Sequence, residues 1–150
     1  MTTDSRGPWL WARQPREQPA LRLFMLPYAG GSCVTYRDWS RLAPEGVEIC
    51  PIELPGHGAR IGEPLLSSMD SLVEQLLRVA TPLLNLPFGL FGHSMGGLVA
   101  FELAKAFRRE GAPTPCHLFV SGCPAPQTPS PARKVHLAPD AELRQRLVEF

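Results

Sequence analysis

The chain has 150 residues, a length that suits one domain, and 44% of them are hydrophobic, which is ordinary for a folded protein. Its 15 basic residues stand against 14 acidic ones, and this net charge of +1 excludes the basic patch that nucleic acid or an acidic membrane would require. No apolar run approaches the length that spans a bilayer.

The cysteines and the first residues predict a reducing, cytoplasmic setting. No two cysteines have C-x-x-C spacing, and no histidine stands at zinc-ligand spacing from one. We therefore expect free, mostly buried thiols, with a metal site as the alternative. Residues 1–20 lack the continuous apolar stretch of a secretory signal. The sequence implies no cofactor. The cysteines are Cys33, Cys50, Cys116 and Cys123.

The first strand is expected directly after a flexible lead-in. Residues 1–20 are rich in proline, arginine and glutamine, and we expect Trp9 and Trp11 to pack locally there, with contact to a partner as the alternative. The apolar run LRLFML at 21–26 suits a buried strand. The glycine-bearing turn PYAGGS follows it at 27–32.

A short helix and a second strand are expected next. Residues 34–42 favour the helix, and residues 47–54 favour the strand. Pro51 places one end of that strand at a sheet edge or in an irregular position, because proline cannot donate to the hydrogen-bond ladder. The turn PGHGAR then leads away from the strand.

The pattern of residues 68–84 is typical of an amphipathic helix, because apolar residues recur at three- and four-residue spacing. Ser71 with Glu74 fits a capping box, and Glu74 with Arg78 fits an i,i+4 ion pair. The apolar face comprises Met69, Leu72, Val73, Leu76, Leu77 and Ala80.

Strands and helices then alternate, which predicts crossover units and a parallel sheet. We expect a short strand at 88–91, a helix at 96–110 that Gly111 ends, and a fourth strand at 117–120. A proline-rich linker follows, and residues 140–150 again carry an amphipathic pattern.

The segment Gly92-His93-Ser94-Met95-Gly96 fits G-x-S-x-G, the nucleophile elbow. A strand turns sharply into a helix there, and the serine projects beyond the strand's carboxyl end, where such sheets place ligands. Both outer positions are glycine because side chains there would collide. The helix directs N–H groups at the site, which favours developing negative charge. The alternative is a plain turn with an incidental serine. We do not expect His93 to be the base.

The turn PYAGGS offers a second part of an active site. An oxyanion hole needs two backbone N–H groups directed at one oxygen. One is expected from Met95, which follows the serine, and the other from Ala29, in the loop after an early strand. Gly30 and Gly31 let the backbone approach a substrate. The alternative is a glycine turn with no such role.

Four segments, PYAGGS, LPGHGAR, FGHSMGG and HLFVSGCPAP, resemble in order and spacing the type II thioesterases of nonribosomal peptide and polyketide pathways. These are relatives of the medium-chain fatty-acid-synthase thioesterases. The resemblance implies an α/β-hydrolase fold with a mostly parallel sheet. Residues 21–150 would be the N-terminal part of one thioesterase domain, with a mobile lid beginning within 124–150. Tyr28 departs from the pattern, since many relatives carry histidine there.

The resemblance also implies a reaction. Ser94 would attack the thioester carbonyl of an acyl group held on the phosphopantetheine arm of a carrier protein. The Met95 and Ala29 N–H groups would hold the oxyanion, and water would hydrolyse the acyl-enzyme. Tyr28, Gly30 and Gly31 are expected to bind substrate, and we expect a monomer.

The acid and the histidine of the catalytic triad are not expected in this chain, because in the family both lie beyond the lid. We therefore expect a longer hydrolase truncated within its lid region. Two alternatives remain open: another serine α/β-hydrolase such as a carboxylesterase, and a non-catalytic remnant that binds carrier proteins. The chain's own candidates, none of which we assign as base or acid, are His57, His93, His117, His136, Asp38, Asp70, Asp140 and Glu53.

Overall fold

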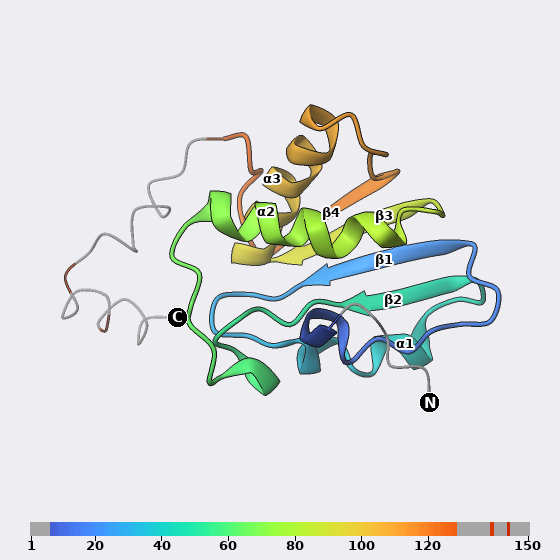
Figure 1. Ribbon diagram of the computed structural model, residues 1–150, viewed down its shortest axis with the longest axis horizontal. Coiled ribbons are helices and arrows are strands. Elements are labelled where there is room, and N and C mark those ends of the chain that lie inside the picture. The colour runs from blue at the N-terminus through green and yellow to red at the C-terminus, as the bar shows by residue number, and fades with distance from the viewer. Residues whose placement is uncertain (1–6, 129–138, 140–143, 145–150) are drawn as a thin grey trace.

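Four parallel strands form one sheet, in the order β2-β1-β3-β4, among the residues that the structure describes. Those residues are 7–128, Pro139 and Arg144 of this computed structural model (Figure 1). Because the strands are parallel, their carboxyl ends meet at the same edge of the sheet. The strands are β1 (Leu21–Leu26), β2 (Val47–Pro51), β3 (Phe88–His93) and β4 (His117–Ser121).

Helices lie on both faces of the sheet. Helices α2 (Met69–Ala80) and α3 (Met95–Arg109) cover one face, and the short α1 (Trp39–Leu42) lies on the other (Figure 1). No helix in the described part of the chain is both long enough and apolar enough to cross a membrane. The described 3₁₀ turns are η1 (Gly7–Leu10), η2 (Cys33–Tyr36), η3 (Gly58–Arg60) and η4 (Thr81–Leu83).

The main core lies between the sheet and the two longer helices. Phe88 of β3 makes edge-on contacts with Phe24 of β1 and Phe107 of α3, at centroid distances of 5.9 and 5.3 Å. Side chains that alternate with these along the strands face the other way, as the strand period requires. Two of them, Met25 of β1 and Ile49 of β2, form a smaller cluster with Tyr36 of η2.

The predicted strands are present, with differences at their ends. β1 spans the predicted 21–26, and β3 and β4 extend further than predicted at their carboxyl ends. β2 ends at Pro51, earlier than predicted; the Ile52 N–H still donates to the Met25 carbonyl of β1 (2.9 Å), and the Glu53 N–H donates to the carbonyl of Trp9 (2.8 Å). Within the described sheet β2 is an edge strand, which is the position that its proline predicted.

The start of α2 corrects one prediction. Ser68 caps the helix, because its hydroxyl accepts a hydrogen bond from the Ser71 N–H at 3.1 Å. The predicted capping box of Ser71 and Glu74 is therefore wrong. Ser71 is not the N-cap but the residue three positions after it, whose N–H the cap Ser68 accepts. The predicted ion pair between Glu74 and Arg78 is present. The predicted helix ends early, at Ala80, and continues as η4.

Two other helices differ slightly from expectation. The one predicted at 34–42 consists of η2 and α1, because i→i+3 bonds such as Arg37 N–H to Val34 O (3.1 Å) close the first piece as a tighter turn. α3 begins one residue earlier than predicted, directly after Ser94. Gly111, with φ +66°, ends it as predicted.

Residues 7–20 pack against the body, in place of the flexible lead-in that we expected. Trp9 and Leu10 are buried, and the guanidinium of Arg60 lies 4.3 Å from the Trp9 ring centroid. Arg13 forms an ion pair with Glu48, a fully buried residue of β2. Apolar contacts and a buried carboxylate thus hold a segment whose composition alone suggested a loose chain.

Candidate active site

Ser94 lies at the sharp turn between β3 and α3. It has φ 53° and ψ −118°, and it is the one non-glycine residue with positive φ in the described part of the chain. Such a conformation costs on the order of 1–3 kcal/mol and persists only where the surroundings enforce it. Here the Ser94 N–H donates to Ser121 O (2.7 Å), and the Gly97 N–H donates to Ser94 O (3.0 Å). The backbone on both sides of the serine is therefore fixed.

The glycines around Ser94 are required by close backbone approach. A Cβ on Gly92 would lie under 3.0 Å from the carbonyl of Gly96, closer than real Cβ atoms come. A Cβ on Gly96 would lie 2.6 Å from the carbonyl oxygen of Pro27 and nearer still to that of Leu26. The first collision is the one expected from the motif. The second shows that the elbow packs directly on the end of β1.

The turn after β1 lies beside the elbow. Leu26, the last residue of β1, pairs with Gly92 in the sheet register, and β3 ends one residue later, at His93. The Gly31 N–H donates to Tyr28 O (2.9 Å), and Gly30 has φ +77°, as the third residue of a type II turn requires. Within the described residues, neither the Ala29 N–H nor the Met95 N–H has a hydrogen-bond acceptor. Both groups can therefore donate to a bound ligand.

None of the described histidines forms a hydrogen bond with Ser94. His93 has its Nδ1 3.1 Å from Ser121 Oγ and its ring edge-on to Tyr28, at 6.1 Å between centroids. His57 Nδ1 is 3.0 Å from the carbonyl oxygen of Pro55. His117 is exposed and stacks on Phe119. His136 and Asp140 lie outside the described residues.

The acidic residues that we considered, and did not assign, are ion-paired, exposed or bonded to other groups. Asp38 forms an exposed ion pair with Arg41 at 3.6 Å, and Asp70 is exposed in the first turn of α2. Glu53 is fully buried among other hydrogen-bond donors. No group of three or more His, Cys, Asp or Glu side chains in the described residues is arranged to hold a metal ion.

A hollow of about 450 Å³ lies next to the elbow and the turn. Aromatic rings form its walls: Trp39 lies 5.2 Å from Phe91 and Tyr36 lies 5.8 Å from Phe91, measured between centroids. Its lining residues are Tyr28, Thr35, Tyr36, Trp39, Phe91, His93 and Ser121.

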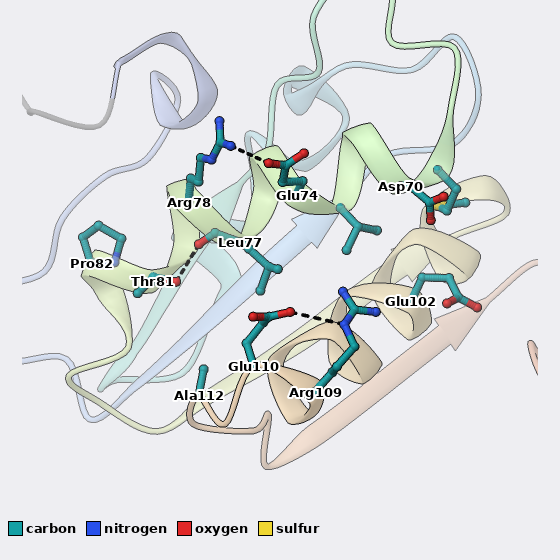
Figure 2. A pocket seen from close by; sticks show the side chains of 12 residues that line it. Asp70, Glu74, Leu77, Arg78, Thr81, Pro82, Glu102, Arg109, Glu110 and Ala112 are labelled. Carbon is teal, nitrogen blue, oxygen red and sulfur yellow. Dashed lines mark hydrogen bonds and ion pairs between the residues drawn. The ribbon is translucent and has the colours of Figure 1, made fainter.

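A larger groove of about 900 Å³ runs between α2 and α3, and the one residue of our candidate set that lines it is the exposed Asp70 (Figure 2). Figure 2 shows two ion pairs along its walls, Glu74 with Arg78 and Glu110 with Arg109. The side chains of both ion pairs are exposed to solvent, as is usual on the outer faces of helices. We therefore place the candidate active site at Ser94 and not in the larger groove.

Two buried acidic groups border the site. Burial, and then the hydrogen bond to Glu53, raise the pKa of the Cys33 thiol from 9.0 to about 12. Burial also raises the pKa of the Tyr36 hydroxyl, from 10.0 to about 12. Both groups therefore stay protonated in the folded protein when their unfolded counterparts already ionise.

We expect the free energy of unfolding to fall as pH rises above about 9, the ordinary pKa of the thiol. The sign follows because the unfolded state releases its protons first, so alkaline pH favours unfolding. Urea unfolding at pH 8 and pH 10.5 measures the effect. Cys33→Ser and Tyr36→Phe should each reduce the difference between the two pH values. A difference equal to the wild type's in both variants would contradict the assignment.

The chain is similar to proteins of one known family. A family model described as "Thioesterase domain" matches residues 21–150. The gramicidin S biosynthesis protein GrsT of Aneurinibacillus migulanus is 44% identical over 127 residues, which is 85% of this chain and 50% of that protein. The chain thus spans about half the length of the curated relatives it matches.

Solved structures of thioesterases also match this chain. The RedJ thioesterase of the prodiginine pathway in Streptomyces coelicolor is 39% identical, with a TM-score of 0.77 over 87% of this chain and 49% of that one. The type II thioesterase BorB of the borrelidin cluster is 37% identical, with a TM-score of 0.75 over 89% of this chain and 57% of that one. The expected α/β-hydrolase fold with a parallel sheet is confirmed.

Proposed function

The chain belongs to the thioesterase family, and from that premise we propose that the protein hydrolyses acyl or aminoacyl thioesters on phosphopantetheinyl carrier proteins during nonribosomal peptide or polyketide synthesis. The observation that carries the proposal is the strained Ser94 between β3 and α3, together with the Ala29 and Met95 N–H groups, which have no acceptor among the described residues. The names of GrsT and BorB, proteins of gramicidin S and borrelidin synthesis, support the pathway class.

In the proposed mechanism Ser94 Oγ attacks the thioester carbonyl, and its proton passes to a general base. The Ala29 and Met95 N–H groups stabilise the oxyanion, aided by the amino-terminal end of α3. The carbon–sulfur bond breaks, and the thiol leaves with a proton. Water then hydrolyses the acyl-enzyme and restores the serine. We assign the base and its orienting acid to no described residue.

The remaining parts of the proposal concern the substrate and the setting. The backbone at Gly30 and Gly31 and the exposed ring of Tyr28 would contact the acyl group or the phosphopantetheine arm. The carrier protein would be the macromolecular partner, with nucleic acid and membrane playing no part. We propose a monomer in the cytoplasm. The lid proposed to begin within 124–150 lies largely outside the described residues.

The test compares two substrates with the same acyl group, one as a carrier-protein thioester and one as a p-nitrophenyl ester. The protein is used as its native cells produce it. We expect a higher kcat/KM for the carrier-bound thioester. A clear preference for the oxygen ester would instead indicate a carboxylesterase. Carrier binding without hydrolysis, unchanged by Ser94→Ala, would indicate a non-catalytic binding protein.

A further inference from the structure

A buried carboxylate, that of Glu53, lies shortly after β2, and we assigned it no role as base or acid. Glu53 is 0% exposed, and neutral donors surround its side chain. The Trp11 indole N–H donates to Oε2 (3.1 Å), and the Ala59 N–H donates to Oε2 (3.3 Å). The Cys33 N–H donates to Oε1 (3.2 Å) and its thiol to Oε2 (3.2 Å). A buried carboxylate is tolerated only where such donors are held in place.

These donors come from three segments that are distant in sequence. Trp11 belongs to the amino-terminal segment, Cys33 follows the turn after β1 as the first residue of η2, and Ala59 belongs to the PGHGAR turn. Gly58 shows how closely the last of these approaches: a Cβ there would lie under 3.0 Å from the Glu53 carboxylate. The carboxylate therefore joins three loops at the site's edge of the sheet.

One of these loops carries the proposed oxyanion donor. The turn at 27–32 leaves β1 at Leu26, whose carbonyl oxygen accepts from the Tyr36 hydroxyl at 3.0 Å. The residue that follows the turn is Cys33, which bonds to Glu53 through both its N–H and its thiol. Both ends of the segment that contains Ala29 are thus fixed by side-chain hydrogen bonds.

We propose that Glu53 is a positioning residue for the oxyanion turn: its carboxylate, acting through Cys33, fixes the segment that presents the Ala29 N–H. The expected effect on catalysis rests on the proposed function, whereas the structural role of Glu53 does not. Glu53 itself touches no reacting atom. Its loss would release the turn and weaken stabilisation of charge in the transition state more than it weakens substrate binding.

The chain provides a matched control in Glu48, which is also 0% exposed but bonds to Arg22 and Arg13. We compare Glu53→Gln and Glu48→Gln in the protein as native cells produce it. For Glu53→Gln we expect hydrogen exchange of the 28–33 amides at least ~10-fold faster than in wild type. We also expect kcat on the carrier thioester to fall ~10- to 100-fold, with KM within about twofold. Glu48→Gln should lower the melting temperature without either effect.

Cys33→Ala is the milder second variant, in case Glu53→Gln does not fold. It removes the thiol donor and should speed exchange of the same amides by a smaller factor. Unchanged exchange in the folded Glu53 variant, or equal acceleration in the Glu48 variant, would overturn the proposal. Faster exchange with unchanged kcat would overturn the catalytic part. A wild type without thioesterase activity would refute the proposed function, and the exchange result would still decide whether Glu53 holds the turn.

Discussion

Replacing Ser94 with alanine is expected to lower kcat on an acyl-carrier thioester by about 10⁵-fold, because it removes the only atom proposed to form the acyl-enzyme. The backbone should keep its conformation, since the bonds from Ser94 N–H to Ser121 O and from Gly97 N–H to Ser94 O do not involve the side chain. Single-turnover hydrolysis measures the loss, and thermal unfolding checks the fold.

The strain at position 94 provides a separate test of the same geometry. Ser94→Gly should be as inactive as Ser94→Ala but more stable by about 1 kcal/mol, because glycine adopts positive φ without steric cost. Ser71→Ala, at an exposed serine of α2, is the activity control. A fluorophosphonate should label wild type at Ser94 and leave Ser94→Ala unlabelled. Labelling of a different residue would refute the nucleophile assignment.

The parts of the fold that depend on neighbouring residues were predictable. Three strands could be predicted from short apolar runs: β1 from residues 21–26, β3 from the run before the elbow and β4 from the run at 117–120. A buried parallel strand needs little more than such a run. The elbow followed from glycine positions, since few backbones bring a strand and a helix so close. Ser68 was missed as the cap because a later Ser–x–x–Glu spacing gave an equally good local match.

The parts that depend on contacts between distant residues were not predictable. Trp11 and Glu53 are 42 positions apart, and no local pattern links an indole in a proline-rich segment to a carboxylate after a strand. The buried state of Glu53 could not be inferred from its charge, which usually indicates exposure. One signal was present: a glutamate directly before a glycine-rich turn, where Gly58 leaves room for its carboxylate.

The second large effect is expected at Gly92. Gly92→Ala would place a methyl group against the carbonyl of Gly96, and neither backbone can yield without moving Ser94. We expect a loss of about 3 kcal/mol or more in the free energy of unfolding, together with loss of fluorophosphonate labelling. Chemical denaturation and labelling of the same sample measure both.

Gly62→Ala is the matched control, because a Cβ at Gly62 would meet nothing within 4 Å. It should unfold within about 0.5 kcal/mol of wild type and keep full labelling. Gly96→Ala separates two causes, since its methyl group would press on the carbonyls of Leu26 and Pro27, at the start of the oxyanion turn. It should therefore impair hydrolysis even in molecules that remain folded. Wild-type stability in Gly92→Ala would mean that the elbow is looser than its geometry requires, and Ser94 would lose the strain that marks it as the nucleophile.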